Sequence, residues 1–399
     1  MLAAVKEEKE PTLYFWSCLG SMSEKLIVPS TRDVLEAAEA ASVDIVLYTL
    51  FTRPLALTVA DKLQAKSCYV HLQPQVPTAM FPHHRHQCEA ADAIASAARS
   101  GALQSVPSDV QESNLQSYWA VERTMFKVYG SSMNAAREAA DLAPLSYDEI
   151  CATAVGTRPG MAIANAFPPA LVPYASDLEP AVHHVGPLAD SYMPLNWLAP
   201  AQLKQYLAAG APPVCVSFGS GFVSNPEQVT RLVYSALRSA GVLRSVVVGG
   251  TAGIGSRHLN TETEEAKELA AWADMHVFNA GDEVPYAWLL PQCCTMLCQG
   301  GAGVVAASLR GGTALVVSPL NADQFMWGRL VDAMGLGAFA GPSLQDVSVD
   351  ALKGAIEKAN GAKVQGRIVE VQKAIQDDGP GVDKMSGLLA DLLSASVHP

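Results

Sequence analysis

Short apolar runs alternate with amphipathic segments along most of the chain. The runs are rich in β-branched residues, which is typical of strands buried on both faces. The segments between them carry apolar residues at helical spacing. This alternation predicts βα units and parallel sheets. The expected strands cover residues 43–50, 67–72, 160–166, 214–218, 245–249, 275–279, 294–298 and 313–318.

One helix is signalled clearly at both ends. Asn225 suits the N-cap, Pro226 the first helical position, and Gln228 completes a capping-box pattern. Gly241 is placed to end the helix. We therefore expect a helix that begins at Pro226 and ends before Gly241.

The regular alternation is interrupted near residues 187–213, a stretch rich in proline and small residues. A chain of 399 residues is expected to form two domains, so we place the boundary there. The prediction is an N-terminal domain over 1–187, a linker over 188–213, a second domain over 214–375 and a terminal helix over 376–399.

Composition narrows the classes of partner. The net charge of -12 disfavours nucleic acid and anionic membranes as main partners, although a helix N-terminus can still bind an anionic small molecule. No apolar run reaches the length of a membrane span, and the charged N-terminus lacks the apolar core of a secretory signal. The eight cysteines are scattered without a CxxC pair, which predicts reduced thiols and a cytoplasmic location.

Three loops at the ends of expected strands carry residues suited to a ligand. The segments SFGSG, at 217–221, and QGGAG, at 299–303, each lie between a strand and a helix, and Asp323-Gln324 follows the strand at 313–318. Ligands of open α/β sheets bind at the carboxyl ends of the strands, so one crevice could collect all three. Taken singly, each also has a plain structural explanation: a tight turn for the glycine loops, and a helix start for Asp323.

The chemistry of these loops suits a phosphorylated sugar. A glycine-rich turn before a helix presents backbone N–H groups and the positive end of the helix dipole to an anion. Neither glycine loop matches a P-loop or G-x-G-x-x-G. A carboxylate beside an amide, as in Asp323-Gln324, offers acceptors and a donor to sugar hydroxyls.

Residues from about 210 to 380 resemble the UDP-sugar glycosyltransferases of the two-domain GT-B fold, in the group that includes sterol 3-beta-glucosyltransferases and bacterial macrolide and glycopeptide glycosyltransferases. The segments that carry the resemblance are PPVCVSFGSGFVSNPE, FNAGDEVPYAWLLPQCCTMLCQGGAGVVAASLRGG and VVSPLNADQFMWGRLVDAMGLG. Within the last of them, DQFMWG favours the sterol branch. The resemblance implies an α/β fold with two Rossmann-like domains whose parallel sheets face each other across a cleft. It also implies that residues 1–187 form the acceptor-side domain and residues 214–375 the donor-binding domain.

The resemblance also implies a role for each loop. Val284, through its backbone, and Trp288 would lie along the nucleotide base, and Asp323 and Gln324 would hold the transferred sugar. Enzymes of this kind use a helix N-terminus in place of a cation, so no metal or other cofactor is expected. The residues expected at the donor diphosphate are Ser220, Gln299, Gly301, Ala302, Gly303 and Val304.

The chain departs from the family pattern in three places. Gln299 stands where histidine is usual and Val304 where threonine is usual, and glutamine can donate a hydrogen bond but carries no charge. Tyr286 replaces the histidine of V-P-H. No G-x-R-G-D-type loop precedes Pro29, so the N-terminal domain is expected to lack its first βα unit, either genuinely or through an incomplete gene model.

The missing loop leaves the catalytic base unidentified. His83, His84 and His86 form the only histidine cluster upstream, and a solvated loop is the favoured interpretation for them over a catalytic role. Trp327 is expected to pack in a helix or to shape the acceptor side. The tail predicts two helices separated at 377–381, the last of which would cross back to the N-terminal domain. Its apolar face would be Met385, Leu388, Leu389, Leu392 and Leu393.

The leading hypothesis is a glycosyltransferase that moves a hexose, with glucose favoured, from a UDP-sugar to a hydroxyl of a lipophilic acceptor such as a sterol, with inversion. Such an acceptor is compatible with transient contact at a membrane surface. The alternative is a catalytically impaired or half-enzyme UDP-sugar-binding protein that needs a partner for the acceptor side. UDP-sugar 2-epimerases share the two-domain architecture but fit the motifs less well.

Overall fold

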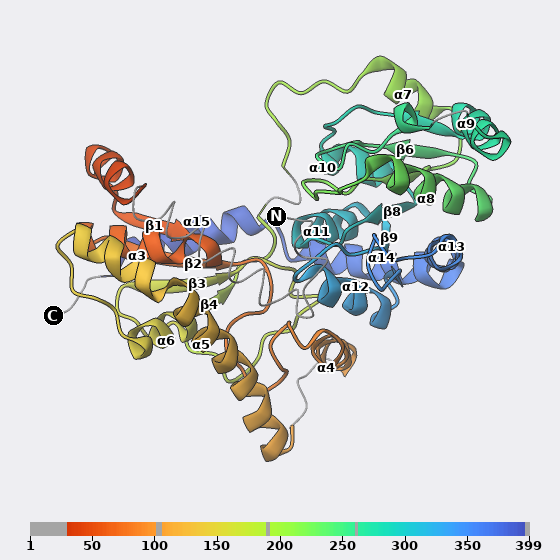
Figure 1. Cartoon of the computed structure of the whole chain (residues 1–399). Coiled ribbons are helices and arrows are strands. Elements are labelled where there is room, and N and C mark those ends of the chain that lie inside the picture. The colour runs from red at the N-terminus through yellow and green to blue at the C-terminus, as the bar shows by residue number, and fades with distance from the viewer. Residues whose placement is uncertain (1–29, 101–105, 189–191, 260–261, 396–399) are drawn as a thin grey trace.

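The computed structural model describes residues 30–100, 106–188, 192–259 and 262–395. These residues form two bodies, each built on a parallel sheet with helices on its faces (Figure 1). The prediction of an α/β protein with two parallel sheets is therefore confirmed. The expected absence of a G-x-R-G-D-type loop concerns residues 1–29, which lie outside the described residues, so the incomplete first domain stays a prediction.

The first sheet has the order β1-β2-β3-β4, and every neighbouring pair is parallel. Helices α3 (Arg53–Leu63), α5 (Ser108–Ala139) and α6 (Tyr147–Val155) cover one face, where Leu57, Met133 and Ile150 pack against Tyr69 and Ile163 of the sheet. The strands are β1 (Ile45–Tyr48), β2 (Lys66–His71), β3 (Met161–Asn165) and β4 (Val182–His184).

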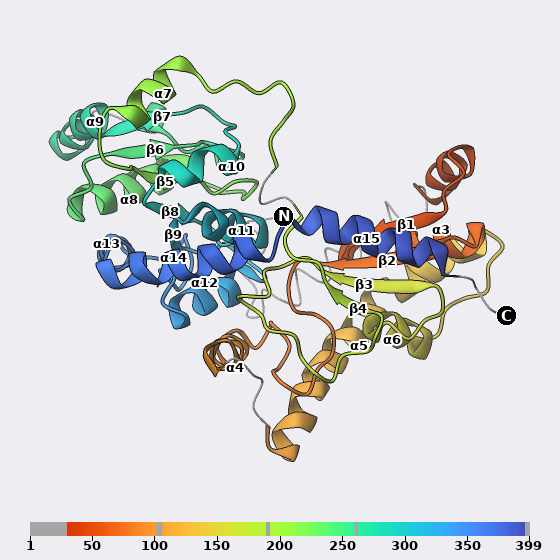
Figure 2. The same ribbon diagram turned by 180° about the vertical axis from the view of Figure 1, so that it is seen from behind.

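The opposite face of this sheet is covered by the last helix, α15 (Gly381–Ser394), which crosses back from the second body (Figure 2). Met385 is buried among Cys68, Val70 and Ala164, and the small side chains of β3 allow the helix to approach closely. The partly buried members of the contact are Leu388, Leu389 and Leu392. Leu393 is 46% exposed, so its predicted place in this face is wrong.

The second sheet has the order β10-β9-β8-β5-β6-β7, again with parallel pairs throughout. Along the chain, β5, β6 and β7 are added toward one edge of the sheet, and β8, β9 and β10 toward the other edge. The strand order therefore reverses between β5 and β8. A crevice forms at such a switch point, outside the carboxyl ends of the strands. The strands are β5 (Val214–Val216), β6 (Ser245–Val247), β7 (Val277–Asn279), β8 (Thr295–Cys298), β9 (Ala314–Val317) and β10 (Gly337–Phe339).

The helices of the second body follow its strands in turn. The Asn225 side-chain oxygen accepts a hydrogen bond from the Gln228 N–H at 3.0 Å, so the cap predicted for the first of them is confirmed. The helices are α8 (Pro226–Ser239), α9 (Glu264–His276), α10 (Tyr286–Leu289), α11 (Ala302–Gly311), α12 (Gln324–Ala333), α13 (Val349–Ala359) and α14 (Ala362–Asp377).

Two helices belong to the second body although their residues fall in ranges assigned to the linker and to the first domain. Helix α7 (Ala201–Ala208) falls within the range assigned to the linker, and Leu203 on it is buried in the core of the second body. Helix α4 (Gln87–Ser100) falls within the range of the first domain but packs against α12. Arg99 Nη1 donates a hydrogen bond to the Ala333 carbonyl at 2.9 Å. The first part of the chain thus contributes a helix to the second body.

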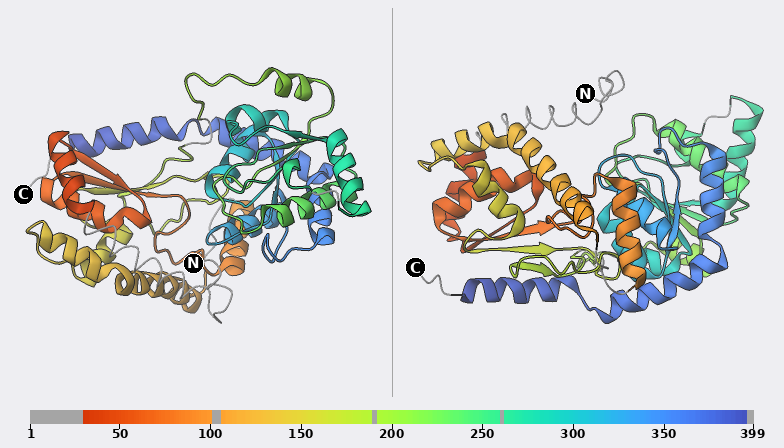
Figure 3. Two further views of the ribbon diagram at one scale, coloured as in Figure 1. Left: turned by 45° about the horizontal axis from the view of Figure 1, so that its top comes forward. Right: turned by 90° about the horizontal axis from the view of Figure 1, so that it is seen from below.

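The chain crosses between the two bodies at a tight contact. Helices α14 and α15 run end to end along both bodies, while α4 lies beside the second body (Figure 3). A Cβ atom on Gly381 would stand 2.2 Å from the Pro187 carbonyl oxygen, so only glycine allows the two crossing segments to touch.

None of the helices in the described ranges combines the length and apolar character needed to cross a membrane.

Candidate functional site

The three loops singled out in the sequence converge at the switch point of the second sheet. Because β5 lies beside β8, and β8 beside β9, the segments that follow these strands are neighbours. A Cβ atom on Gly219 would stand 3.3 Å from Gln299 Nε2, and one on Gly221 would stand 2.6 Å from Leu320 Cδ1. The structure therefore brings 217–221, 299–303 and the loop before Asp323 into contact.

The start of α11 presents free backbone donors. Ala302, Gly303 and Val304 occupy its first turn, so their N–H groups have no acceptor within the helix. The side chain of Val304 is buried, which leaves only its backbone for a ligand. Gly303 is exposed, and a Cβ atom there would have no neighbour within 4 Å. An anion can therefore approach the backbone closely at Gly303.

Gln299 lies between the two glycine turns and is only 8% exposed. Its Nε2 is 3.3 Å from the Cβ position of Gly219 and 3.6 Å from that of Gly301, so the donor end of the amide faces both turns. Its Oε1 is buried without a hydrogen-bond partner. We call the two glycine turns, 217–221 and 299–303, the glycine cradle. A side chain that turns an N–H group toward this cradle suits an anion, although without the charge of a histidine.

Tyr286 also lies at this candidate site, a position that the sequence did not predict. Its hydroxyl stands 3.7 Å from the Cβ position of Gly219, at the same turn that Gln299 reaches. Burial raises the pKa of Tyr286 well above its usual value, so the phenol stays a neutral donor at physiological pH. The sequence registered this position only as the loss of a histidine.

Asp323 is the N-cap of α12 and Gln324 is its first residue, and both side chains already make hydrogen bonds within the protein. Asp323 Oδ2 accepts a hydrogen bond from Trp327 Nε1 at 3.0 Å, and burial raises the pKa of the Asp323 carboxyl above its usual value. Gln324 Oε1 accepts the backbone N–H groups of Leu320 at 2.8 Å and Asn321 at 3.1 Å. Gln324 thus fixes the loop with its oxygen, and its amide nitrogen is the end that can donate to a ligand.

The residues expected along the nucleotide are more varied in their surroundings. Ser220 is exposed at the turn after β5, and the Val284 side chain is buried, so that only its backbone is available. Trp288 is half-buried and packs against Trp197, with ring centroids 5.1 Å apart. Trp197 lies in the range predicted as linker, so that segment reaches the expected base site.

A further glycine-rich loop, residues 249–255, supports the 217–221 loop and was not predicted from the sequence. A Cβ atom on Gly250 would stand 2.6 Å from the Gly219 carbonyl oxygen, and the Thr251 N–H donates to that oxygen at 2.9 Å. The loop therefore holds the Gly219 turn in place from β6. Its signal was present as GGTAGIG directly after a predicted strand.

The solvated loop predicted for the upstream histidines is wrong for two of them. His83 is 4% exposed and His84 is 9% exposed, whereas His86 is exposed as expected. Burial lowers the pKa of His83 well below its usual value and that of His84 to about 3. Within the residues that the structure describes, no group of three or more His, Cys, Asp or Glu side chains is arranged to hold a metal ion.

No protein-family model matches the chain. The chain is 31% identical over 214 residues to a sterol 3-beta-glucosyltransferase of Arabidopsis thaliana, an overlap that covers 53% of this chain and 30% of the relative. A second such enzyme of the same plant is 28% identical over 242 residues, covering 60% of this chain and 36% of the relative. The chain thus spans about a third of the length of these plant relatives.

Solved structures give the fold over nearly the whole chain. The spinosyn rhamnosyltransferase SpnG superposes with a TM-score of 0.60 at 16% identity, covering 96% of this chain and 82% of that chain. Os79 from O. sativa, solved in complex with UDP, superposes with a TM-score of 0.61 at 14% identity, covering 94% of this chain and 84% of that chain. The chain has the GT-B glycosyltransferase fold, and its sequence is similar to that of the sterol 3-beta-glucosyltransferases.

Proposed function

We propose that the chain is a glycosyltransferase that moves a hexose, with glucose favoured, from a UDP-sugar to a hydroxyl of a lipophilic acceptor such as a sterol. The convergence of the glycine cradle, Gln299 and Asp323-Gln324 at one switch point carries the proposal. The names of the sterol 3-beta-glucosyltransferases support the acceptor class, and the UDP complex of Os79 supports the nucleotide. The comparisons lend no support to the alternative of a half-enzyme that borrows its acceptor side.

The proposed reaction inverts the anomeric carbon. A base removes the proton of the acceptor hydroxyl, and the acceptor oxygen forms a bond to the anomeric carbon. The bond from that carbon to the β-phosphate oxygen breaks, and UDP leaves with the electron pair. The N–H groups of Ala302, Gly303 and Val304, with Gln299 and Ser220, stabilise the charge that develops on the diphosphate, so no metal ion enters the proposal.

The remaining residues would orient the donor. Asp323 accepts hydrogen bonds from hydroxyls of the sugar, and Gln324 donates one from its amide nitrogen. Trp288 and the backbone at Val284 would lie along the uracil. A cytoplasmic location is part of the proposal, supported by the scatter of the eight cysteines along the sequence.

The test is calorimetric titration of the purified chain with UDP and with UDP-glucose, followed by a transfer assay with cholesterol. Both nucleotides are expected to bind, UDP-glucose more tightly, and the assay should yield the β-glucoside. No heat of binding at millimolar UDP would overturn the proposal, because the donor site is its foundation.

Replacing Gln299 with histidine is expected to tighten UDP binding by about fivefold at pH 6, because a charge-assisted hydrogen bond is roughly twice as strong as a neutral one. The imidazolium loses its proton as the pH rises, and burial favours that loss, so the gain should shrink as the pH rises toward 8. Titration with uridine, which lacks phosphate, is the control. An equal gain for uridine and UDP would mean that Gln299 does not face the diphosphate.

A further inference from the structure

The first sheet ends in a row of polar side chains. His71, Asn165 and His184 are the last residues of β2, β3 and β4, and they are direct neighbours in register. In-register neighbours of a parallel sheet project to the same face. Three polar groups from distant parts of the sequence are thereby placed side by side at the carboxyl edge, where open α/β sheets bind their ligands.

Most of the hydrogen-bonding capacity of this row is unused within the protein. Asn165 Nδ2 and His184 Nε2 lie 3.1 Å apart. Both ring nitrogens of His71, Asn165 Oδ1 and His184 Nδ1 are buried without a hydrogen-bond partner. His71 is 1% exposed and Asn165 3% exposed. A buried polar group without a hydrogen-bond partner destabilises the folded state, so a concentration of such groups points to a ligand rather than to stability.

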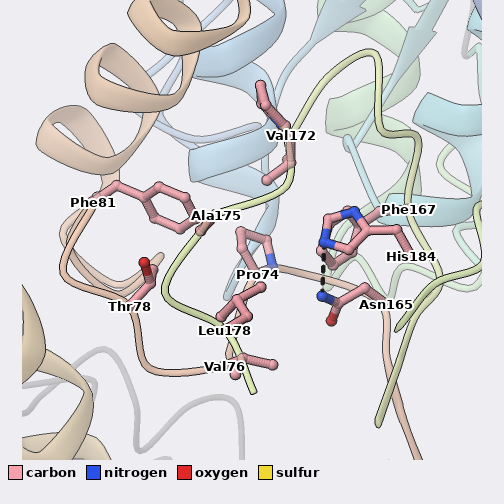
Figure 4. A pocket seen from close by; sticks show the side chains of 11 residues that line it. Pro74, Val76, Thr78, Phe81, Asn165, Phe167, Val172, Ala175, Leu178 and His184 are labelled. Carbon is pink, nitrogen blue, oxygen red and sulfur yellow. Dashed lines mark hydrogen bonds between the residues drawn. The ribbon is translucent and has the colours of Figure 1, made fainter. Parts of the chain in front are cut away.

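A small pocket of about 10 Å³ opens beside the row (Figure 4). Asn165 and His184 line it together with apolar side chains that include Phe81, Phe167 and Val172. Its volume is about that of one water-sized group. A pocket that is apolar apart from a few convergent polar atoms fits the single polar group of a molecule that is otherwise apolar.

The row also faces the proposed donor site. The Phe167 ring centroid lies 5.5 Å from that of His184 and 6.2 Å from that of Trp327. Trp327 in turn donates its indole hydrogen bond to Asp323. One aromatic ring therefore separates the polar row from the tryptophan that holds the carboxylate proposed to bind the sugar.

The row carries no charge at neutral pH. Burial, reinforced by the positive charge of Arg53, lowers the pKa of His71 to about 3, and burial lowers that of His184 to about 4. Neutral imidazole and carboxamide groups both donate and accept, as a hydroxyl does, whereas a carboxylate or phosphate would find no cation in the row. An imidazole with so low a pKa is a poor general base, which favours a positioning role over proton transfer.

We infer that the row of His71, Asn165 and His184 binds the hydroxyl group of a sterol-class acceptor and positions its oxygen toward the donor sugar. This inference rests on the proposed function and adds to it the site that recognises the acceptor. The row would then make the protein selective for molecules that carry an uncharged hydroxyl on an apolar body.

The experiment compares cholesterol with its 3-deoxy counterpart, which has the same apolar body without the hydroxyl. Dissociation constants for both are measured by tryptophan fluorescence in detergent micelles, with UDP-glucose titrated in parallel. The wild-type chain is expected to bind cholesterol about tenfold more tightly, the value of one or two net hydrogen bonds. The variant His184→Phe should bind the two sterols equally, and His184→Gln should keep most of the preference.

The matched control is His183→Phe, because His183 lies one residue earlier on β4, is exposed and belongs to the opposite face of the sheet. It should keep the wild-type ratio. The ratio compares two ligands on one preparation, so a partial loss of folded protein cancels. If His184→Phe does not fold, Asn165→Leu carries the same expectation, because Asn165 lines the same pocket.

The outcomes separate this inference from the proposed function. A wild-type chain that binds both sterols equally, or neither, overturns the inference, and so does a preference that survives both His184→Phe and Asn165→Leu. If the same chain binds UDP-glucose, the donor half of the proposed function still stands. A wild-type chain that does not bind UDP-glucose would instead overturn the proposed function itself.

Discussion

Replacing Asp323 with alanine is expected to remove the part of the donor affinity that comes from the sugar. UDP should bind the variant as it binds the wild type, within about twofold. UDP-glucose should lose about 10- to 100-fold in affinity, because hydrogen bonds to a charged group contribute about 1.5–3 kcal/mol. Transfer to the acceptor should fall at least as far, since the sugar is no longer held for attack. Paired calorimetric titrations and initial rates measure both effects.

The matched control for this change is Asp332→Ala at the other end of α12, where Asp332 pairs with Lys358. It should leave both nucleotides unaffected. Asp323→Asn should fall between the wild type and alanine, because the amide oxygen can still accept the hydrogen bond of Trp327. An Asp323→Ala variant that transfers sugar at the normal rate would remove Asp323 from the site.

The same carboxyl predicts the direction of a pH effect. Burial raises the pKa of Asp323, and only the ionised form accepts hydrogen bonds with both oxygens. The extra affinity for UDP-glucose over UDP should therefore be complete above the raised pKa and fall as the pH drops through it. In Asp323→Asn the difference between the two nucleotides should not vary with pH.

Two glycines in the cradle are expected to respond to alanine in opposite ways. Gly300 has a φ of +85°, and a Cβ atom there would stand 2.4 Å from Val317 Cγ1 in the core. Strain of about 1–2 kcal/mol and overpacking of about 1–3 kcal/mol should together lower the free energy of unfolding by about 2–5 kcal/mol. Chemical denaturation of Gly300→Ala measures this loss.

Gly303→Ala should do the reverse, because the position is helical and open. The free energy of unfolding should rise by up to about 1 kcal/mol, while UDP binding weakens about tenfold or more, since the methyl group fills the space of close approach. Gly354→Ala on α13, also helical and open, is the control and should change stability alone. Unchanged UDP binding by Gly303→Ala would contradict the placement of the diphosphate.

Much of the second body could be predicted from the sequence, because its strands are β-branched apolar runs and its glycine loops and Asp323 follow them directly. The order of the strands in the parallel sheet then brings these loops together, because β5 lies beside β8 and β8 beside β9. Strand β10 (Gly337–Phe339) escaped because three residues of mixed character carry no periodic signal. Helix α7 escaped because the prolines around it dominated the composition of the range.

The proposed acceptor side could not be predicted in the same way. The polar row joins residues whose strands are far apart in the sequence, so no local pattern connects His71 with Asn165 or His184. His83 and His84 form a polar run that favours exposure on local grounds, and only the tertiary packing of the loop buries them. Tyr286 reaches the cradle through the fold, since it belongs to a helix outside the three loops.

The packing of α4 on α12 would couple binding of the proposed donor to binding of the proposed acceptor. Asp323 stands at the start of α12, and the segment that leads into α4 carries His83 and His84, which lie beside the polar row. A shift of α12 on donor binding would move α4 and reset the affinity for the acceptor. Linkage then requires that the acceptor change the affinity for the donor by the same factor, so that the dissociation constant of each depends on whether the other is bound.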